Sequence, residues 1–266
     1  MPGGDLRDAV LDATVARFQH AVLQRAFGNY TKSYELHRRV SNIEQLFLRA
    51  LRDRPDPRVL DVGCGDGYHI CLFNSIPAVR ERVAFTAIDV SRTDLWLARA
   101  LAGALSYDNI RHVTCAAEEL AFPDSCFDIA LCSDVIEHLP RPERCLAEMF
   151  RVVKPGGMAI LTTPNESSWV KALARVVHRG APRPIEDDQV HISTKGFREW
   201  RRLAAEAGFW VTAARRGALL FGGPKYNRHP ALFALILLID RLLDLVPFTQ
   251  NCSEAISFGL VKPKAS

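Results

Sequence analysis

The stretch RVLDVGCGDGY, residues 58–68, decides the fold expected for this chain. Its first five residues are mostly apolar, as in a buried strand, and residues 68–74 after the glycines are predicted to form a helix. Gly63, Gly65 and Gly67 have no Cβ, so the backbone there can pass close to a ligand. The amino end of the following helix offers N–H donors and a positive dipole end. The stretch therefore predicts a strand–turn–helix unit that holds a nucleotide-type ligand.

A carboxylate stands at the end of the next apolar strand. Asp89 ends the strand predicted over residues 83–89, 22 residues after Gly67, where an acid accepts hydrogen bonds from both hydroxyls of an adenosine ribose. The G-x-G-x-G spacing differs from the G-x-G-x-x-G typical of dinucleotide sites. Asp61, two residues before Gly63, suits a cationic, amine-bearing ligand better than a pyrophosphate.

Strand and helix patterns alternate along the rest of the chain. Further strands are predicted at 110–115, 127–132, 158–163, 209–214 and 255–261, and helices at 92–104, 141–153, 195–207 and, in a largely apolar segment, 231–245. Residues 5–53 also show helical periodicity, with a break at Gly28 and Asn29. Such alternation predicts an α/β fold with a largely parallel sheet and right-handed crossovers.

The motifs DVGCGDG, strand-end Asp89, EELAFPDSCFDIALCSDVIEHL and VVKPGG together resemble the class I S-adenosylmethionine-dependent methyltransferases over residues 58–163. The resemblance implies a Rossmann-like, doubly wound, mostly parallel seven-stranded sheet whose last strand, antiparallel, is supplied by AISFGLVK. We expect a helical cap over residues 1–54 and the methyltransferase domain over 55–266, with a helical insertion near 221–250.

The resemblance also assigns the cofactor site. The Gly63–Gly67 loop is expected against the methionine part of S-adenosylmethionine, and Asp89 on its ribose. The full set of expected cofactor residues is Asp61, Gly63, Gly65, Gly67, Asp89, Val90, Ala117, Glu118 and Ser133. One position departs from the family: Ala116 stands where an acid often contacts the adenine amino group, so Ala117 backbone groups or the Glu118 side chain are expected instead. Arg38 is either a partner of the methionine carboxylate or part of a solvated basic face.

A candidate active site follows the fourth predicted strand, where Asp134, Glu137 and His138 lie within five residues. In one interpretation these residues only order the loop. In another they bind a divalent cation (magnesium, manganese or zinc) with His191 as a fourth ligand, an arrangement that resembles the quinone-pathway O-methyltransferases. The ion would lower the pKa of the acceptor hydroxyl. In a third, His138 or His191 is the general base without a metal. Glu137, His138 and His191 are thus the catalytic candidates.

Composition limits the partners and the compartment. The net charge of +4 is spread along the chain, without a dense basic stripe, so a nucleic acid partner is not expected. Seven cysteines without a CxxC pair indicate free thiols in a reducing, cytoplasmic compartment. The longest apolar run, residues 231–239, is too short to span a bilayer. The segment ALFALILLIDRLLDLVPF, residues 231–248, is either a buried helix, a lid for a greasy substrate, or a surface helix on the inner face of a membrane.

The leading hypothesis is methyl transfer from S-adenosylmethionine to a small hydrophobic acceptor, most simply a hydroxyl of a phenol, quinone precursor or secondary metabolite. Two alternatives remain at this point. One is a nicotinamide-dependent oxidoreductase, which the G-x-G-x-G spacing disfavours. The other is a non-catalytic cofactor-binding subunit, for which the Ala116 departure is the support.

Overall fold

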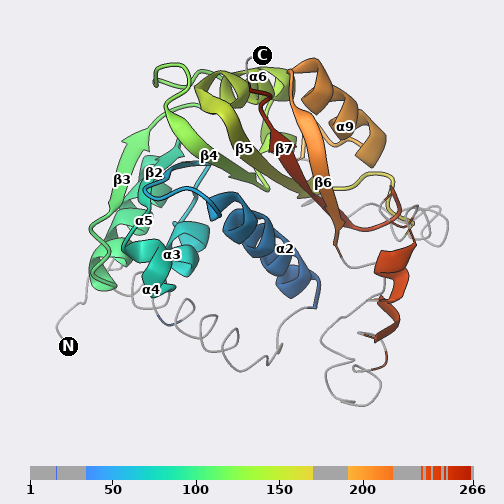
Figure 1. Ribbon diagram of the computed structural model, residues 1–266, viewed down its shortest axis with the longest axis horizontal. Helices are drawn as coiled ribbons and strands as arrows, with labels where there is room; N and C mark the ends of the chain where they lie inside the picture. Colours follow the sequence, from blue (N-terminus) through green and yellow to red (C-terminus); the bar gives the residue numbers. More distant parts are fainter. Residues whose placement is uncertain are drawn as a thin grey trace, which may run out of the picture.

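The computed structural model describes residues 34–169, 191–217 and 251–264, together with residues 16, 235, 238–240, 242–246 and 249. Its centre is a seven-stranded sheet in the order β3-β2-β1-β4-β5-β7-β6 (Figure 1). The strands are β1 Arg58–Val62, β2 Ala84–Asp89, β3 Ile110–Thr114, β4 Phe127–Ser133, β5 Val153–Pro164, β6 Trp210–Arg216 and β7 Ala255–Val261.

Strand directions confirm the expected topology. β1 pairs in parallel with β2 and β4, and β4 pairs in parallel with β5. β7 is antiparallel to both of its neighbours, β5 and β6, so β6 runs in the same direction as β5. The carboxyl ends of β1, β4, β5 and β6 consequently share one edge of the sheet, which is where ligands bind in open α/β sheets.

Helices cover both faces of the sheet. The described helices are α2 Tyr34–Leu51, α3 Tyr68–Asn74, α4 Pro77–Arg80, α5 Arg92–Ala104, α6 Pro142–Val152 and α9 Phe197–Glu206, with short 3-10 turns η1 Ile136–His138 and η3 Leu243–Leu245. One apolar core lies between the sheet and α2, α3 and α5, and contains Phe47, Phe73 and Leu95. A second lies under α6 and α9 and contains Met149 and Trp200, and a small third cluster includes Leu72 of α3 and Leu101 of α5. Figure 1 shows α2 lying diagonally across the front of the sheet.

Most predicted elements within the described residues agree with the structure to within a few residues. Two short elements, α4 and η1, have no counterpart in the prediction. β5 starts earlier than predicted, because Val153 already pairs with Phe127 before the register shifts at the following glycines. The predicted helix before residue 34 and most of the insertion near 221–250 lie outside the described residues. Among the helices that are described, none has the length and apolar character needed to cross a membrane.

Candidate active site

The glycine loop is tied to the end of β2. The backbone N–H groups of Gly63 and Cys64 both donate to the Ile88 carbonyl, at 2.8 and 2.9 Å. Gly63 has φ +70°, and a Cβ built on it would lie 2.4 Å from Cγ2 of Val135. Gly65 has φ +51°, but a Cβ built on it would have no neighbouring atom within 4 Å, so this side of Gly65 faces open space. The loop thus presents bare backbone at the ligand edge.

Asp89 organises two backbone groups at the same edge. Its Oδ2 accepts a hydrogen bond from the N–H of Gly65 at 2.9 Å, and its Oδ1 accepts one from Ser91 at 2.8 Å. Ser91 in turn caps α5, because its hydroxyl accepts from the N–H of Asp94 at 3.2 Å. The carboxylate is therefore held in one orientation, with lone pairs still available for the ribose hydroxyls expected there.

Asp61 is a buried acid behind the loop, with 2% of its surface exposed. Burial, and then the nearby charge of Asp89, raise its pKa to about 7. Its Oδ2 has no hydrogen-bond partner among the residues that the structure describes. A buried, unpaired acceptor is costly, and an amine such as that of the methionine part of the cofactor would satisfy it. The residues present fit an S-adenosylmethionine site on this ground.

The remaining expected cofactor residues differ in their surroundings. Ala117 is nearly buried, and Val90 is 68% exposed directly after β2. The hydroxyl of Ser133, at the end of β4, is buried and lacks a partner within the described part of the chain. Glu118 already has a protein partner: its Oε1 accepts from the backbone N–H of Arg141 at 2.8 Å, just before α6. This bond holds the Glu118 carboxylate beside the start of α6, and its contact with the cofactor stays a prediction.

Glu137, His138 and His191 form a cluster beyond β4, in which one ligand atom from each residue lies within 4.8 Å of the others. The two imidazole ring centroids are 4.7 Å apart. Residue 191 comes from a distant segment that is docked on η1 by two hydrogen bonds from Ser193. The backbone N–H of Ser193 donates to the Glu137 carbonyl at 2.9 Å, and the Ser193 hydroxyl donates to the Leu139 carbonyl at 2.6 Å.

Glu137 is the buried member of this cluster, with 1% of its surface exposed. Its Oε2 accepts from the Thr163 hydroxyl at 3.2 Å, and its Oε1 lacks a hydrogen-bond partner within residues 34–169 and the other described segments. Burial raises its pKa to about 7. A carboxylate next to two imidazoles can hold a proton near neutral pH or bind a divalent cation.

Asp134 lies outside this cluster, in contrast to the expected metal ligand set. It has φ +54°, and its Oδ2 forms an ion pair with Nη1 of Arg39, from α2, at 2.9 Å. Arg38, for which the sequence left two interpretations open, pairs through its guanidinium with Asp244. Arg39 and Thr163 were not among the residues expected from the sequence. An arginine near the amino end of a long helix carried no signal that distinguished it from its neighbours.

Comparison with known proteins identifies the family. The family described as a methyltransferase domain matches residues 53–208 of this chain. The chain belongs to the class I S-adenosylmethionine-dependent methyltransferases. This membership, together with the sheet order and glycine loop above, identifies S-adenosylmethionine as the cofactor and argues against the nicotinamide alternative.

Among curated relatives, the methyltransferase is 29% identical over 198 residues to a ubiquinone biosynthesis O-methyltransferase of Klebsiella pneumoniae, covering 71% of this chain and 77% of that protein. A protein of the same description from Pseudomonas fluorescens is 31% identical over 153 residues. That match covers 55% of this chain and 63% of the relative, less than two thirds of its length. A phosphatidylethanolamine N-methyltransferase of Cereibacter sphaeroides is 35% identical over 39% of this chain and 49% of its own length.

Solved structures agree on the fold. Geranyl diphosphate C-methyltransferase of Streptomyces coelicolor, in complex with Mg²⁺, geranyl diphosphate and S-adenosylhomocysteine, superposes with a TM-score of 0.57 at 13% identity, covering 84% of this chain and 78% of that one. The [4+2]-cyclase SpnF superposes with a TM-score of 0.58 at 18% identity, over 85% and 82% of the two chains. Because a cyclase shares the fold, the acceptor chemistry has to be argued from the site.

Proposed function

We propose that this methyltransferase transfers the methyl group of S-adenosylmethionine to a hydroxyl oxygen of a small, hydrophobic acceptor. The observation that carries the proposal is the cluster of Glu137, His138 and His191 at the carboxyl end of β4, next to the glycine loop. O-methylation is also the activity named for the Klebsiella and Pseudomonas relatives. The acceptor would be a phenol, a quinone precursor or a similar secondary metabolite.

The cofactor half of the site is assigned from the hydrogen bonds around the loop. In this proposal the ribose hydroxyls bind Asp89, whose carboxylate is oriented by Gly65 and Ser91. The amine of the methionine part pairs with Asp61, and the bare backbone at Gly65 lies against the methionine chain. Val90, Ala117 and Ser133 line the adenine and sulfur sides.

The reaction requires alignment of the acceptor and removal of one proton. The hydroxyl oxygen attacks the methyl carbon as the carbon–sulfur bond breaks, giving a methyl ether, S-adenosylhomocysteine and a proton. His138 or His191 receives that proton, and Glu137 stabilises the imidazolium that forms. Because Glu137 is buried and its Oε1 lacks a partner among described atoms, it is well suited to this role.

The same three residues fit a divalent cation. Two imidazoles and one carboxylate suit manganese or zinc better than magnesium, which prefers oxygen ligands alone. Such an ion would lower the pKa of the acceptor hydroxyl. Asp134 is omitted from this ligand set because it pairs with Arg39.

The decisive experiment separates the metal from the base. The purified enzyme would be assayed for S-adenosylhomocysteine formation with a hydrophobic catechol, in excess chelator and after addition of manganese, zinc or magnesium. Binding of manganese alone would be followed by calorimetry in the wild type, in Glu137→Gln and in the control Glu143→Gln, whose side chain is exposed on α6. Loss of both metal binding and turnover only in Glu137→Gln supports the cation. If the wild type keeps full turnover in chelator and His138→Ala or His191→Ala loses it, a histidine acts as the base without a metal. Full turnover in Glu137→Gln, His138→Ala and His191→Ala would refute the site.

A peripheral membrane contact is part of this proposal. Leu235, Leu238, Leu242 and Leu245 are between 51% and 79% exposed, at spacings that place them along one helical face, whereas Asp240 on the same segment is fully buried. An apolar face turned outward and an acid turned inward is typical of a helix that rests on a lipid surface. We expect a Leu238→Ser, Leu242→Ser variant to lose co-sedimentation with phospholipid vesicles, and equal sedimentation of both proteins would contradict the contact.

A further inference from the structure

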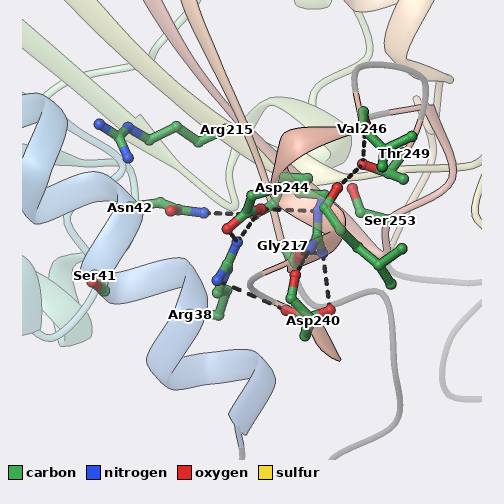
Figure 2. Close-up of polar contacts among 12 residues, drawn as sticks. Arg38, Ser41, Asn42, Arg215, Gly217, Asp240, Asp244, Val246, Thr249 and Ser253 are labelled. Atoms are coloured by element: carbon green, nitrogen blue, oxygen red, sulfur yellow. Dashed lines mark hydrogen bonds and ion pairs between the residues drawn. The ribbon is translucent and has the colours of Figure 1, made fainter. Parts of the chain in front are cut away.

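A polar pocket lies between α2 and the end of β6, apart from the cluster described above. It has a volume of about 310 Å³ and is lined by Arg38 and Asn42 of α2, by the end of β6 at Ala213–Arg216, and by Asp244 of η3. Figure 2 shows Arg38 and Asn42 directed from α2 toward Asp244, whereas the Arg215 side chain extends from β6 toward α2. We name it the arginine pocket. Its volume is at the lower end of the range for small-molecule sites.

Two of its three arginines are neutralised by carboxylates. Arg216 and Asp240 form a buried ion pair at 2.9 Å, with side chains 2% and 0% exposed. Asp244 lies 3.0 Å from Nε of Arg216 and also pairs with Arg38. These contacts fix the floor of the pocket, and the charges of the two arginines and two aspartates balance.

Arg215 is the exception, because it has no acidic partner among the described residues. Its Nη1 donates to the neutral Oε1 of Gln45 at 2.7 Å. Burial and the like charges of Arg49 and Arg38 lower its pKa, and the negative charge of Asp244 opposes that shift. An arginine remains charged under these conditions, so Arg215 brings to the pocket a positive charge that forms no ion pair with a carboxylate of the described residues.

The pocket shares the acceptor side of the molecule with the catalytic cluster. β6 runs in the same direction as β5, so Arg215 and Arg216 stand at the same edge as the end of β4. α2 joins the two places, since Arg39 pairs with Asp134 while Asn42 donates to the Arg216 carbonyl at 2.9 Å. β4 and β6 are three strand spacings apart, which is about 14 Å. One elongated small molecule spans that length.

We propose that the arginine pocket binds the phosphate or carboxylate group of an elongated acceptor whose hydroxyl lies at Glu137, His138 and His191. The inference rests on the proposed function for the position of the hydroxyl. It defines the substrate class as an elongated amphiphile with a hydroxyl at one end and an anion at the other. A guanidinium matches both anions, since its parallel N–H groups bind two oxygens at once.

The test uses the full chain saturated with S-adenosylhomocysteine and two soluble probes, inorganic pyrophosphate and benzoate, titrated by calorimetry. We expect at least one probe to bind the wild type and to bind Arg215→Gln at least tenfold more weakly. Arg215→Lys, which keeps the charge, should fall between the two. The control Arg198→Gln removes an exposed arginine of α9 and should bind as the wild type does. Thermal unfolding of each variant checks that it is folded.

Two results would overturn the inference. In the first, neither probe binds the wild type, or Arg215→Gln binds as tightly. In the second, only vesicles of anionic phosphatidylglycerol bind, and they do so through Arg215, which assigns the pocket to a membrane headgroup instead of an acceptor. Binding of the anion probes is measured without turnover and does not involve the Glu137 cluster. A loss of probe binding therefore reports on the arginine pocket alone, whereas failure of the proposed hydroxyl chemistry appears in the turnover assay.

Discussion

At the residue scale, Gly63 and Gly65 lie two positions apart in one loop but face different neighbours. A Cβ at Gly63 would lie 2.4 and 2.7 Å from the two Cγ atoms of Val135, in a residue with φ +70°. We expect Gly63→Ala to destabilise the protein by about 3 kcal/mol, from overpacking and backbone strain together. Gly65→Ala meets open space, so only about 1 kcal/mol of strain is expected, but its methyl group would occupy the cofactor side of the loop.

Urea unfolding and calorimetric titration with S-adenosylhomocysteine separate the two glycine effects. Gly63→Ala should shift the unfolding midpoint, and adding Val135→Ala should recover part of the loss. Gly65→Ala should unfold close to the wild type but bind the cofactor product poorly. Equal losses of stability in both variants would show that Val135 does not constrain the loop.

Asp89 is the residue on which the loop and the expected ribose contacts both depend. Asp89→Ala leaves the N–H groups of Gly65 and Ser91 without their acceptor. We expect affinity for S-adenosylhomocysteine to fall by about 2 kcal/mol or more, roughly thirtyfold, because hydrogen bonds to a charged group are lost. Asp108→Ala, which removes an exposed carboxylate, is the matched control. Wild-type affinity in Asp89→Ala would refute the cofactor assignment.

At the element scale, agreement with the sequence follows the strength of the local signal. β1 and α5 match their predicted bounds, since an apolar run and a serine cap define them. The short turn η1 was not predicted because three residues carry no periodicity, and its position depends on the positive φ of Asp134. The metal candidates illustrate the same limit. Sequence proximity suggested Asp134, whereas the fold pairs Asp134 with Arg39. His191, which the sequence analysis had proposed as a further ligand, does lie beside His138.

The segment that carries η3 is attached to the fold by a buried ion pair. Removing the Asp240 carboxylate leaves the buried Arg216 with the half-exposed Asp244 as its remaining acidic partner, beside the backbone carbonyls of Gly217 and Asp240. We expect Asp240→Ala to lower the free energy of unfolding by about 3 kcal/mol. Glu206→Ala, which breaks the exposed pair with Arg202 on α9, should cost less than about 0.5 kcal/mol. Urea denaturation of both variants measures the difference, and similar midpoints would show that the buried pair does not anchor the segment.

At the scale of the whole molecule, the buried acid Asp61 links the stability of the enzyme to pH. Its pKa rises from 3.8 to about 7 on folding, mainly through burial, so the folded state binds the proton more tightly than the unfolded chain. The free energy of unfolding should therefore fall as pH rises from about 4 to about 7 and level off above it, by an amount on the order of 4 kcal/mol. Asp61→Asn is neutral throughout and should lack this part of the decline.

Urea midpoints of the ligand-free wild type and Asp61→Asn at pH 4.5, 6 and 7.5 measure this effect. Glu137, whose pKa is also raised to about 7, contributes a second decline that both proteins share, so the quantity that matters is the difference between the two curves. The urea midpoint of Asp61→Asn should exceed that of the wild type by a larger amount as pH rises. Saturating S-adenosylhomocysteine should narrow it, because the amine that we assign to Asp61 favours the ionised carboxylate in the folded state. Curves that stay parallel without ligand would mean that Asp61 is not a buried neutral acid, and a difference unaffected by ligand would place the amine elsewhere in the site.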